Sequence, residues 1–161
     1  MDVKKRNLFL PVMIATMAFG SSLSSAADIE KTIEARQSFM RVYSFNLGLV
    51  GDMAKGKSQY DAEIAANAAK NLLALAKMDN GPMWPQGTSK EDPGLSEKTR
   101  ALPETWTTYP KVSERHKELT EALEKFVNVA GKDLASLRMG IKDVGKGCKG
   151  CHESFRAEEE E

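Results

Sequence analysis

Five residues near the C-terminus, Cys148 to His152, carry the chemistry that the sequence indicates most directly. They read Cys-Lys-Gly-Cys-His, and Cys148 and Cys151 are the only two cysteines among the 161 residues. Cys-x-x-Cys-His is the attachment motif of covalently bound c-type haem. On a helix, Cys148 and Cys151 point about 60° apart, and His152 lies about 40° from Cys148. Two thiols can therefore form thioethers with the two vinyl groups of a haem while the adjacent imidazole reaches the iron.

Other sites also use a Cys-x-x-Cys pair. In an exported protein the pair can form a short disulfide or a thioredoxin-like redox motif. The redox motif normally follows a strand at the start of a helix, and this sequence has no strand-rich pattern. A zinc site needs at least three protein ligands, and His116 is the only other cysteine or histidine beyond the motif. The sequence therefore favours haem attachment and leaves a disulfide-stapled helical protein as the alternative.

The start of the chain predicts export. A basic stretch, Lys4 to Arg6, precedes an apolar run from Leu8 to Phe19 and small residues at 21–27, the pattern of a cleaved signal peptide at residues 1–27. The apolar run is shorter than the ~20 residues of a membrane-spanning helix. We expect a periplasmic protein with one domain, residues 28–161, which is large enough for one core. Its 20 basic and 22 acidic residues suggest no nucleic-acid partner, and we expect no membrane association after cleavage.

Hydrophobic periodicity predicts the fold class. Apolar residues recur mainly at steps of three and four in four segments, 29–54, 61–78, 110–130 and 133–157. Between the second and third segments, residues 80–103 contain four prolines and three glycines, so we expect an ordered irregular crossover there. Since no strand pattern is present, the sequence predicts an all-α protein. We expect an antiparallel four-helix bundle with a covalently attached haem c among its helices.

The last helix predicts where the thiols point. Its apolar seam steps by three and four residues through Leu134, Leu137, Ile141, Val144, Cys148, Cys151 and Phe155. Because both cysteines lie on this seam, their thiols should face the core of the bundle. His116 falls on the apolar stripe of the third helix, where we expect it to be partly buried or at the edge of the stripe, and not to bind iron. Gly48 and Gly51 in the first helix should allow a neighbouring helix or a flat ring to approach closely.

The position of the motif, after three helices and within ten residues of the C-terminus, is unusual for small c-type cytochromes. In this respect the chain resembles the class II cytochromes, and specifically cytochrome c′. The resemblance covers residues 29–157. The matching motifs are Arg36-Gln37, Ala54-Lys55-Gly56-Lys57, Trp84-Pro85-x-Gly87-Thr88, Lys98-Thr99-Arg100, Pro103 with Trp106, Val144-Gly145, and Cys148 through Arg156.

The resemblance implies a set of residues that bind the cofactor. One haem c would be attached through two thioethers, the propionates would lie beside an arginine and a glutamine, and two loop residues would close the haem edge. These residues are Cys148 and Cys151, Arg36 and Gln37, and Thr99 and Arg100. The resemblance also implies that His152 is the proximal iron ligand and that Arg156 lies near it.

Met40 matches the position that faces the distal side of the iron. If its thioether does not bind iron, the resemblance implies a five-coordinate iron that is open to nitric oxide and carbon monoxide. If it does bind, the protein is a low-spin electron carrier, ligated by Met40 and His152, that does not bind gases. We favour the open iron, because the loop after Met83 is similar to that of the high-spin members.

The resemblance implies electron transfer with redox partner proteins, binding of nitric oxide or carbon monoxide, and a homodimer formed through the first two helices. A haem enzyme is disfavoured by the residues around Met40, which are Phe39, Tyr43 and Leu47. General acid–base catalysis needs a titratable group within reach, and this stretch contains no histidine. We therefore expect a protein that is not an enzyme.

Overall fold

The computed structural model describes residues 26–158, and these residues are helical apart from their turns and loops. The elements, in chain order, are α1 (Ala26–Ala54), α2 (Ala62–Lys77), the short 3₁₀ helix η1 (Gly81–Met83), α3 (Glu104–Thr107), α4 (Tyr109–Val127) and α5 (Leu134–Phe155). Apart from its last two residues, the predicted signal peptide at residues 1–27 lies outside the described residues. The predicted all-α fold is confirmed. Among residues 26–158, no helix combines the length and the apolar character needed to cross a bilayer.

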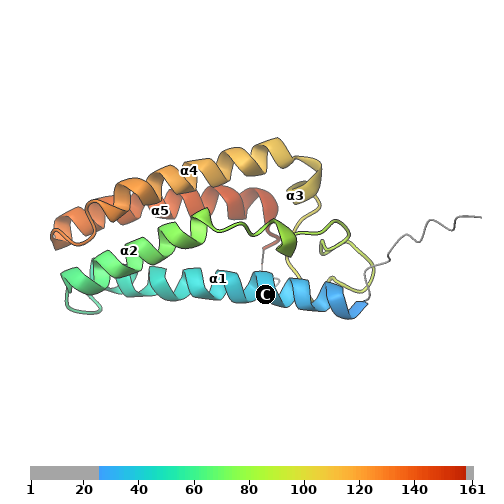
Figure 1. Ribbon diagram of the computed structural model, residues 1–161, viewed down its shortest axis with the longest axis horizontal. Coiled ribbons are helices and arrows are strands. Elements are labelled where there is room, and N and C mark those ends of the chain that lie inside the picture. The colour runs from blue at the N-terminus through green and yellow to red at the C-terminus, as the bar shows by residue number, and fades with distance from the viewer. Residues whose placement is uncertain (1–25, 159–161) are drawn as a thin grey trace, which may run out of the picture.

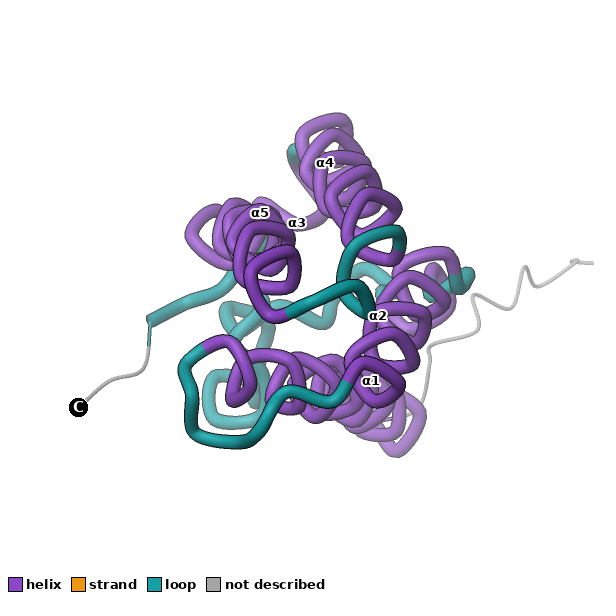
Figure 2. The backbone as a smooth tube through the Cα atoms, turned by 90° about the vertical axis from the view of Figure 1, so that its left-hand side faces the viewer, coloured by secondary structure: helices purple, strands orange, loops and turns teal. Residues whose placement is uncertain are grey.

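The four long helices form an antiparallel bundle. Seen end on, α1, α2, α4 and α5 occupy four corners, and each helix packs against the two that flank it (Figure 2). The crossover between α2 and α4, together with α3, gathers at one end of the bundle (Figure 1). The start of α1 and the end of α5 lie at this same end. Residues far apart in the sequence, from α1, the crossover and the end of α5, are therefore brought close together here.

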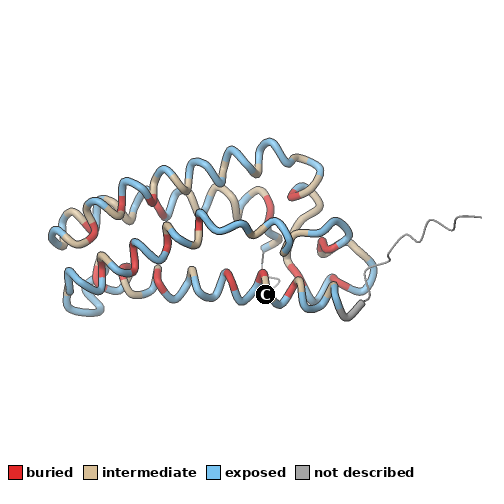
Figure 3. Tube along the Cα trace, in the orientation of Figure 1, coloured by how far each residue is buried: buried red, intermediate tan, exposed pale blue. Residues whose placement is uncertain are grey.

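The core runs along the inner faces of the four helices (Figure 3). Every long helix contributes at least one fully buried side chain, and α2 contributes small ones. The fully buried core consists of Val50, Ala65, Ala68, Ala69, Leu72, Ala76, Leu123, Phe126, Ala130, Leu137 and Val144. Burying one large apolar side chain contributes about 1.5–3 kcal/mol to folding, so this cluster holds the bundle together.

Local capping fixes where two of the helices begin. Asp61 and Asp133 precede α2 and α5 in extended conformations. The Asp61 carboxylate accepts a hydrogen bond from the Ile64 backbone N–H at 2.9 Å, and Asp133 accepts one from Ser136 at 2.8 Å. Each bond satisfies one of the amide groups that a helix leaves without a partner at its N-terminus.

The helix ends differ from the predicted ones. α4 ends at Val127 instead of residue 130, and the following turns bring Gly131 against α2, where an added Cβ would lie 2.9 Å from the Ala66 Cβ. α5 ends at Phe155 instead of residue 157, because Arg156 and the residue after it pair with the crossover. These boundaries depend on contacts between distant segments, and hydrophobic periodicity does not contain that information.

The sequence predicted that Gly48 and Gly51 would let a neighbouring helix or a flat ring approach closely. For a neighbouring helix, this prediction is wrong. A Cβ at either position would meet no heavy atom of the described chain within 4 Å. The close approach is instead between α5 and α4. A Cβ at Gly140 would lie 2.7 Å from the Phe126 ring, and one at Gly147 would lie 3.0 Å from the Leu119 Cα. These two glycines allow α5, which carries the cysteine motif, to pack tightly on α4.

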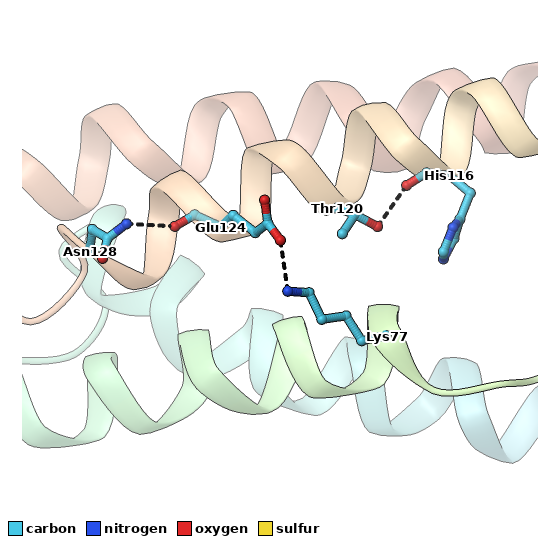
Figure 4. A network of polar contacts seen from close by, with 5 residues as sticks. All are labelled: Lys77, His116, Thr120, Glu124 and Asn128. Atoms are coloured by element: carbon cyan, nitrogen blue, oxygen red, sulfur yellow. Dashed lines mark hydrogen bonds and ion pairs between the residues drawn. The ribbon is translucent and has the colours of Figure 1, made fainter.

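One polar contact joins α2 to α4 on the outer surface of the bundle. The Lys77 ammonium pairs with the Glu124 carboxylate at 2.7 Å (Figure 4). On α4 itself, Asn128 donates to the Glu124 carbonyl oxygen, and the Thr120 hydroxyl donates to the His116 carbonyl oxygen. Exposed ion pairs of this kind contribute at most about 1 kcal/mol, so the interior packing determines how the helices are arranged.

Candidate haem site

The two thiols and the imidazole of the motif lie in the last two turns of α5. Cys148, Cys151 and His152 are half-buried, and both cysteines are free thiols in the structure. Burial raises the pKa of Cys148 and of Cys151 above the ordinary value of a thiol. The Cys148 side chain packs against the core, as the seam of α5 predicts. At neutral pH, α5 therefore presents two protonated thiols from the side that faces the bundle interior.

The His152 imidazole is suited to bind a metal. Burial lowers the pKa of His152, and the nearby cations Arg156 and Arg100 lower it further. A histidine with a pKa below its ordinary value of about 6.5 is neutral at pH 7, and the neutral ring is the form that binds metals. The two arginines therefore favour the protonation state in which His152 can act as a ligand.

Arg36 is a buried cation at the opposite side of the site, on α1. Only 4% of its surface is exposed. Its guanidinium donates to the Thr88 hydroxyl and to the Thr88 carbonyl oxygen, both at 2.9 Å, and to the Thr99 hydroxyl at 3.4 Å. Burial lowers the pKa of Arg36 to about 10, so the side chain is still positively charged at neutral pH. Within residues 26–158, no carboxylate pairs with this charge.

Two tryptophans enclose the Arg36 guanidinium. Its central carbon lies 4.7 Å from the centre of the Trp84 ring and 5.9 Å from that of Trp106, within the range of cation–π attraction. The Trp106 indole N–H donates to the Trp84 carbonyl oxygen at 2.9 Å. The crossover and α3 are thus folded around one α1 side chain. The sequence analysis matched both tryptophans to the family but did not assign them this contact.

Gln37 and Lys98 fix the crossover to the start of α1 beside Arg36. The Gln37 amide donates to the Lys98 carbonyl oxygen at 2.9 Å, and the Lys98 ammonium pairs with Glu30. Gln37 itself is exposed, whereas Thr99 is buried at 7% exposure. The structure therefore brings three of the sequence-predicted residues together: Arg36, Gln37 and Thr99.

Arg100 connects the crossover to the end of α5. Its guanidinium donates twice to the Ala157 carbonyl oxygen, at 2.9 and 2.7 Å. In return, the Ala157 N–H donates to the Arg100 carbonyl oxygen at 2.8 Å, and the Leu102 N–H donates to that of Phe155 at 3.0 Å. These bonds hold Arg100 and the residues after His152 in one short antiparallel pairing. The chain from Thr99 to Arg100 therefore links the buried cation on α1 to the imidazole on α5.

The structure does not bury Met40 among the apolar residues of α1. It is 40% exposed, and the buried residue at this turn is its neighbour Phe39, at 7% exposure. The Phe39 and Tyr43 rings meet edge to face, 5.2 Å apart between centres. The thioether of Met40 thus plays no part in the protein core.

Of the two positions expected for His116, the partly buried one is wrong, because its side chain is exposed on α4 (Figure 4). α4 instead contributes Arg115, which lies against the cysteine motif. A Cβ at Gly150 would lie 3.5 Å from the Arg115 Cδ. The Arg115 Nε is buried without a hydrogen-bond partner in the described part of the chain, while Nη1 binds Glu118. The sequence analysis missed this residue, because its charge resembles that of the other solvent-facing residues of α4.

The residues present fit a haem with two propionates. Two thiols and a neutral imidazole can hold the vinyl groups and the iron. An unpaired buried cation is costly, and a carboxylate from outside the chain would compensate Arg36. A planar guanidinium is well matched to a carboxylate, with which it can form paired hydrogen bonds.

Comparison with known proteins points to one family. The family described as Cytochrome C' matches residues 31–156. Cytochrome c-554 of Cereibacter sphaeroides is 39% identical over 131 residues, which cover 81% of this chain and 96% of the relative. Cytochrome c′ of Halomonas halodenitrificans is 34% identical and covers 82% of this chain and 100% of the relative. Both alignments span nearly the whole length of the relatives.

Solved structures show the same arrangement of helices. A cytochrome c′ from Rhodobacter Spheriodes superposes with a TM-score of 0.77 at 30% identity, over 82% of this chain and 99% of that chain. A variant of cytochrome c′ from Alcaligenes xylosoxidans, solved with carbon monoxide bound, has a TM-score of 0.68 at 26% identity and covers 82% and 98%. Another cytochrome c′, at TM-score 0.72, 28% identity and 81% and 97% coverage, shows ligand-controlled dimer dissociation.

Proposed function

Because the chain belongs to the cytochrome c′ family, whose members carry a covalently bound haem c, we propose that it is a periplasmic electron-transfer protein that also binds nitric oxide or carbon monoxide. One observation supports this most strongly. Two half-buried thiols and a neutral imidazole on α5 are linked, through the crossover, to a buried cation on α1 that has no carboxylate partner among residues 26–158. Export by the segment at residues 1–27 delivers the chain to the compartment in which haem c is attached.

Each residue of the site has a separate task. Cys148 and Cys151 hold the haem covalently, and His152 binds the iron from the α5 side. Arg36 and Gln37 hold the propionates, while Thr99 and Arg100 close the edge of the site. When bound, the haem supplies the redox couple and an iron that can take a diatomic gas. The protein contributes orientation and a low dielectric, and we assign no catalytic residue.

Gas binding requires that no protein side chain occupies the distal position of the iron. A variant of a relative with the same fold was solved with carbon monoxide bound, which supports an accessible iron here. Around this position α1 offers Phe39 and Tyr43. Phenylalanine cannot bind iron, and burial raises the pKa of Tyr43, so its phenol stays protonated and is not the tyrosinate that can ligate a haem. We therefore favour five-coordinate iron with His152 as its only ligand from the protein.

A low-spin electron carrier with Met40 and His152 as ligands is the second candidate. Met40 is not packed into the protein core, so its thioether is available either to bind the iron or to line the site without binding it. In this second candidate the iron has no free position for a gas.

We also propose that the protein is a homodimer formed through α1 and α2. The outer faces of these helices carry exposed apolar side chains, including Val42, Phe45 and Met78. Between the helices lies a groove of about 450 Å³ that is lined mainly by apolar residues. A cytochrome c′ of similar fold forms a dimer that dissociates under the control of its ligand, which supports this assignment. Redox partner proteins would bind elsewhere on the surface.

The optical spectrum of the reduced protein, with and without carbon monoxide, tests the proposal. We expect a high-spin ferrous spectrum that changes when carbon monoxide is added. A low-spin spectrum that carbon monoxide does not change would refute gas binding and identify Met40 as a ligand.

Replacing Met40 with Leu distinguishes the two candidates. Leucine has similar volume but cannot bind iron, so an open iron predicts the same spectrum before and after substitution. Conversion of a low-spin spectrum into a high-spin one would show that Met40 ligates. Met139→Leu is the control, because Met139 is exposed on the surface of α5.

A further inference from the structure

Arg115 on α4 lies against the backbone of the cysteine motif. A Cβ placed at Gly150, between the two cysteines, would lie 3.5 Å from the Arg115 Cδ and 3.9 Å from its Nε. One turn away on α4, Leu119 makes the corresponding contact with Gly147, where a Cβ would lie 3.0 Å from the Leu119 Cα. The close packing of α4 on α5 therefore continues as far as the motif and fixes the Arg115 side chain beside it.

The two sides of the Arg115 guanidinium differ in their surroundings. On the outer side, Nη1 donates to both carboxylate oxygens of Glu118, at 3.0 and 2.8 Å, and the Glu118 side chain is 49% exposed. On the inner side, Nε is buried and has no hydrogen-bond partner among residues 26–158. Buried N–H groups normally have a partner, because leaving one unsatisfied is costly. The positive charge is thus compensated only on the side that faces water.

Of the two attachment residues, Cys151 is the one beside this charge. It follows Gly150 directly and lies one turn after Gly147, the two residues of α5 that contact α4 here. Cys148, by contrast, packs against the hydrophobic core. Burial raises the pKa of Cys151, and the Arg115 charge opposes that rise, as expected for neighbouring side chains. A haem bonded to Cys151 would therefore have one edge close to the guanidinium.

We propose that Arg115 raises the reduction potential of the haem that Cys151 holds. Reduction adds one electron to the iron, so the ferrous haem carries one positive charge less than the ferric haem, and a nearby cation favours the ferrous state. The effect is stronger where protein replaces water around the charge. Glu118 moderates it from the outer side. This inference rests on the haem attachment of the proposed function, and it holds whether or not Met40 binds the iron.

Spectroelectrochemical titration of the haem-loaded protein tests the inference. In Arg115→Met we expect the equilibrium constant for reduction to fall about three- to tenfold, which lowers the potential by about 30–60 mV at about 59 mV per tenfold. Arg115→Lys keeps the charge and should retain most of the wild-type potential. Glu118→Gln removes the compensating carboxylate, leaves the arginine on Gly150, and should raise the potential.

Lys117→Met is the matched control, because Lys117 is an α4 cation whose side chain is 79% exposed and lies 3.8 Å from the Glu121 carboxylate. Solvent and salt screen such a charge, so the variant should keep the wild-type potential. Equal shifts in Lys117→Met and Arg115→Met would overturn the inference, since they would reflect net charge alone. Equal losses in Arg115→Lys and Arg115→Met would also overturn it, since they would show a role of side-chain shape.

The remaining outcomes separate this inference from the proposed function. If the wild type carries haem and Arg115→Met has its potential, the Arg115 assignment is wrong while the proposed function stands. If Arg115→Met does not fold, an unchanged potential in Glu118→Gln overturns the assignment instead. If mass spectrometry shows that the wild-type chain carries no haem, the proposed function and the Arg115 assignment fail together.

Discussion

At the scale of single residues, the site depends on charges and hydroxyls placed where water does not reach them. Arg36 is the clearest case. It is buried between Trp84 and Trp106, and its hydrogen bonds go to Thr88 and Thr99 of the crossover. The same guanidinium therefore organises a long irregular segment, and in the proposed function its positive charge would pair with a carboxylate of the haem.

Arg36→Lys tests whether the shape of this cation matters as well as its charge. Lysine keeps the charge but loses the planar fork that reaches both threonines and stacks on the rings. We expect the free energy of unfolding of the haem protein to fall by about 2–4 kcal/mol in urea titrations. Arg41→Lys is the control, because Arg41 is exposed and bonds only to Ser38. Equal losses in the two variants would contradict the role of Arg36.

At this scale, the sequence predicted which residues carry the chemistry better than it predicted which residues contact one another. The types and spacing of Cys148, Cys151 and His152 pointed to haem attachment, and the resemblance pointed to Arg36. The stacking of Trp84 and Trp106 on Arg36 joins residues 48 and 70 positions apart, and no local pattern encodes it. The resemblance also pointed to Met40, and at this turn the structure exposes Met40 and buries its neighbour Phe39.

At the scale of elements, α5 must both carry the Cys-x-x-Cys-His motif and pack closely on α4. Gly147 and Gly140 allow the close approach, and Asp133 fixes the start of the helix. Periodicity located the four long helices within a few residues of their bounds. Periodicity did not identify which glycines permit close packing. A glycine has no side chain, so it adds nothing to a hydrophobic pattern that could indicate its neighbours.

Gly147→Ala and Gly145→Ala form a matched pair on α5. At Gly147 the new Cβ would lie 3.0 Å from the Leu119 Cα and 3.1 Å from its Cδ1, so we expect a loss of about 1–3 kcal/mol in the free energy of unfolding. At Gly145 nothing lies within 4 Å. Alanine there should stabilise the helix by up to about 1 kcal/mol. Urea unfolding of both variants measures the difference, and a destabilised Gly145→Ala beside an unchanged Gly147→Ala would contradict the packing.

At the scale of the whole molecule, the bundle brings the site together at one end and leaves the outer faces of α1 and α2 free (Figure 1). The crossover is fixed to α1 by Arg36 and Gln37 and to α5 by Arg100. This arrangement connects the two sides of the haem site through one segment. The exposed apolar side chains of α1 and α2 form a surface suited to a second copy.

Phe45→Glu tests the dimer. Phe45 is 67% exposed on α1, and a charge there would be buried without a partner in the proposed interface. We expect its dimer dissociation constant to rise at least about tenfold, measured by analytical ultracentrifugation. Met139→Glu is the control, since Met139 is 69% exposed on α5, outside the proposed interface. The interface is misplaced if Met139→Glu weakens the dimer and Phe45→Glu does not.

The most direct test of haem attachment is the covalent state of the two cysteines in the protein produced with residues 1–27 in place. Mass spectrometry of a proteolytic peptide that contains Cys148 and Cys151 should show one haem joined to both sulfurs. A variant with both cysteines replaced by alanine should carry no haem on a denaturing gel. A peptide without haem, in which Cys148 and Cys151 are joined by a disulfide, would contradict the account.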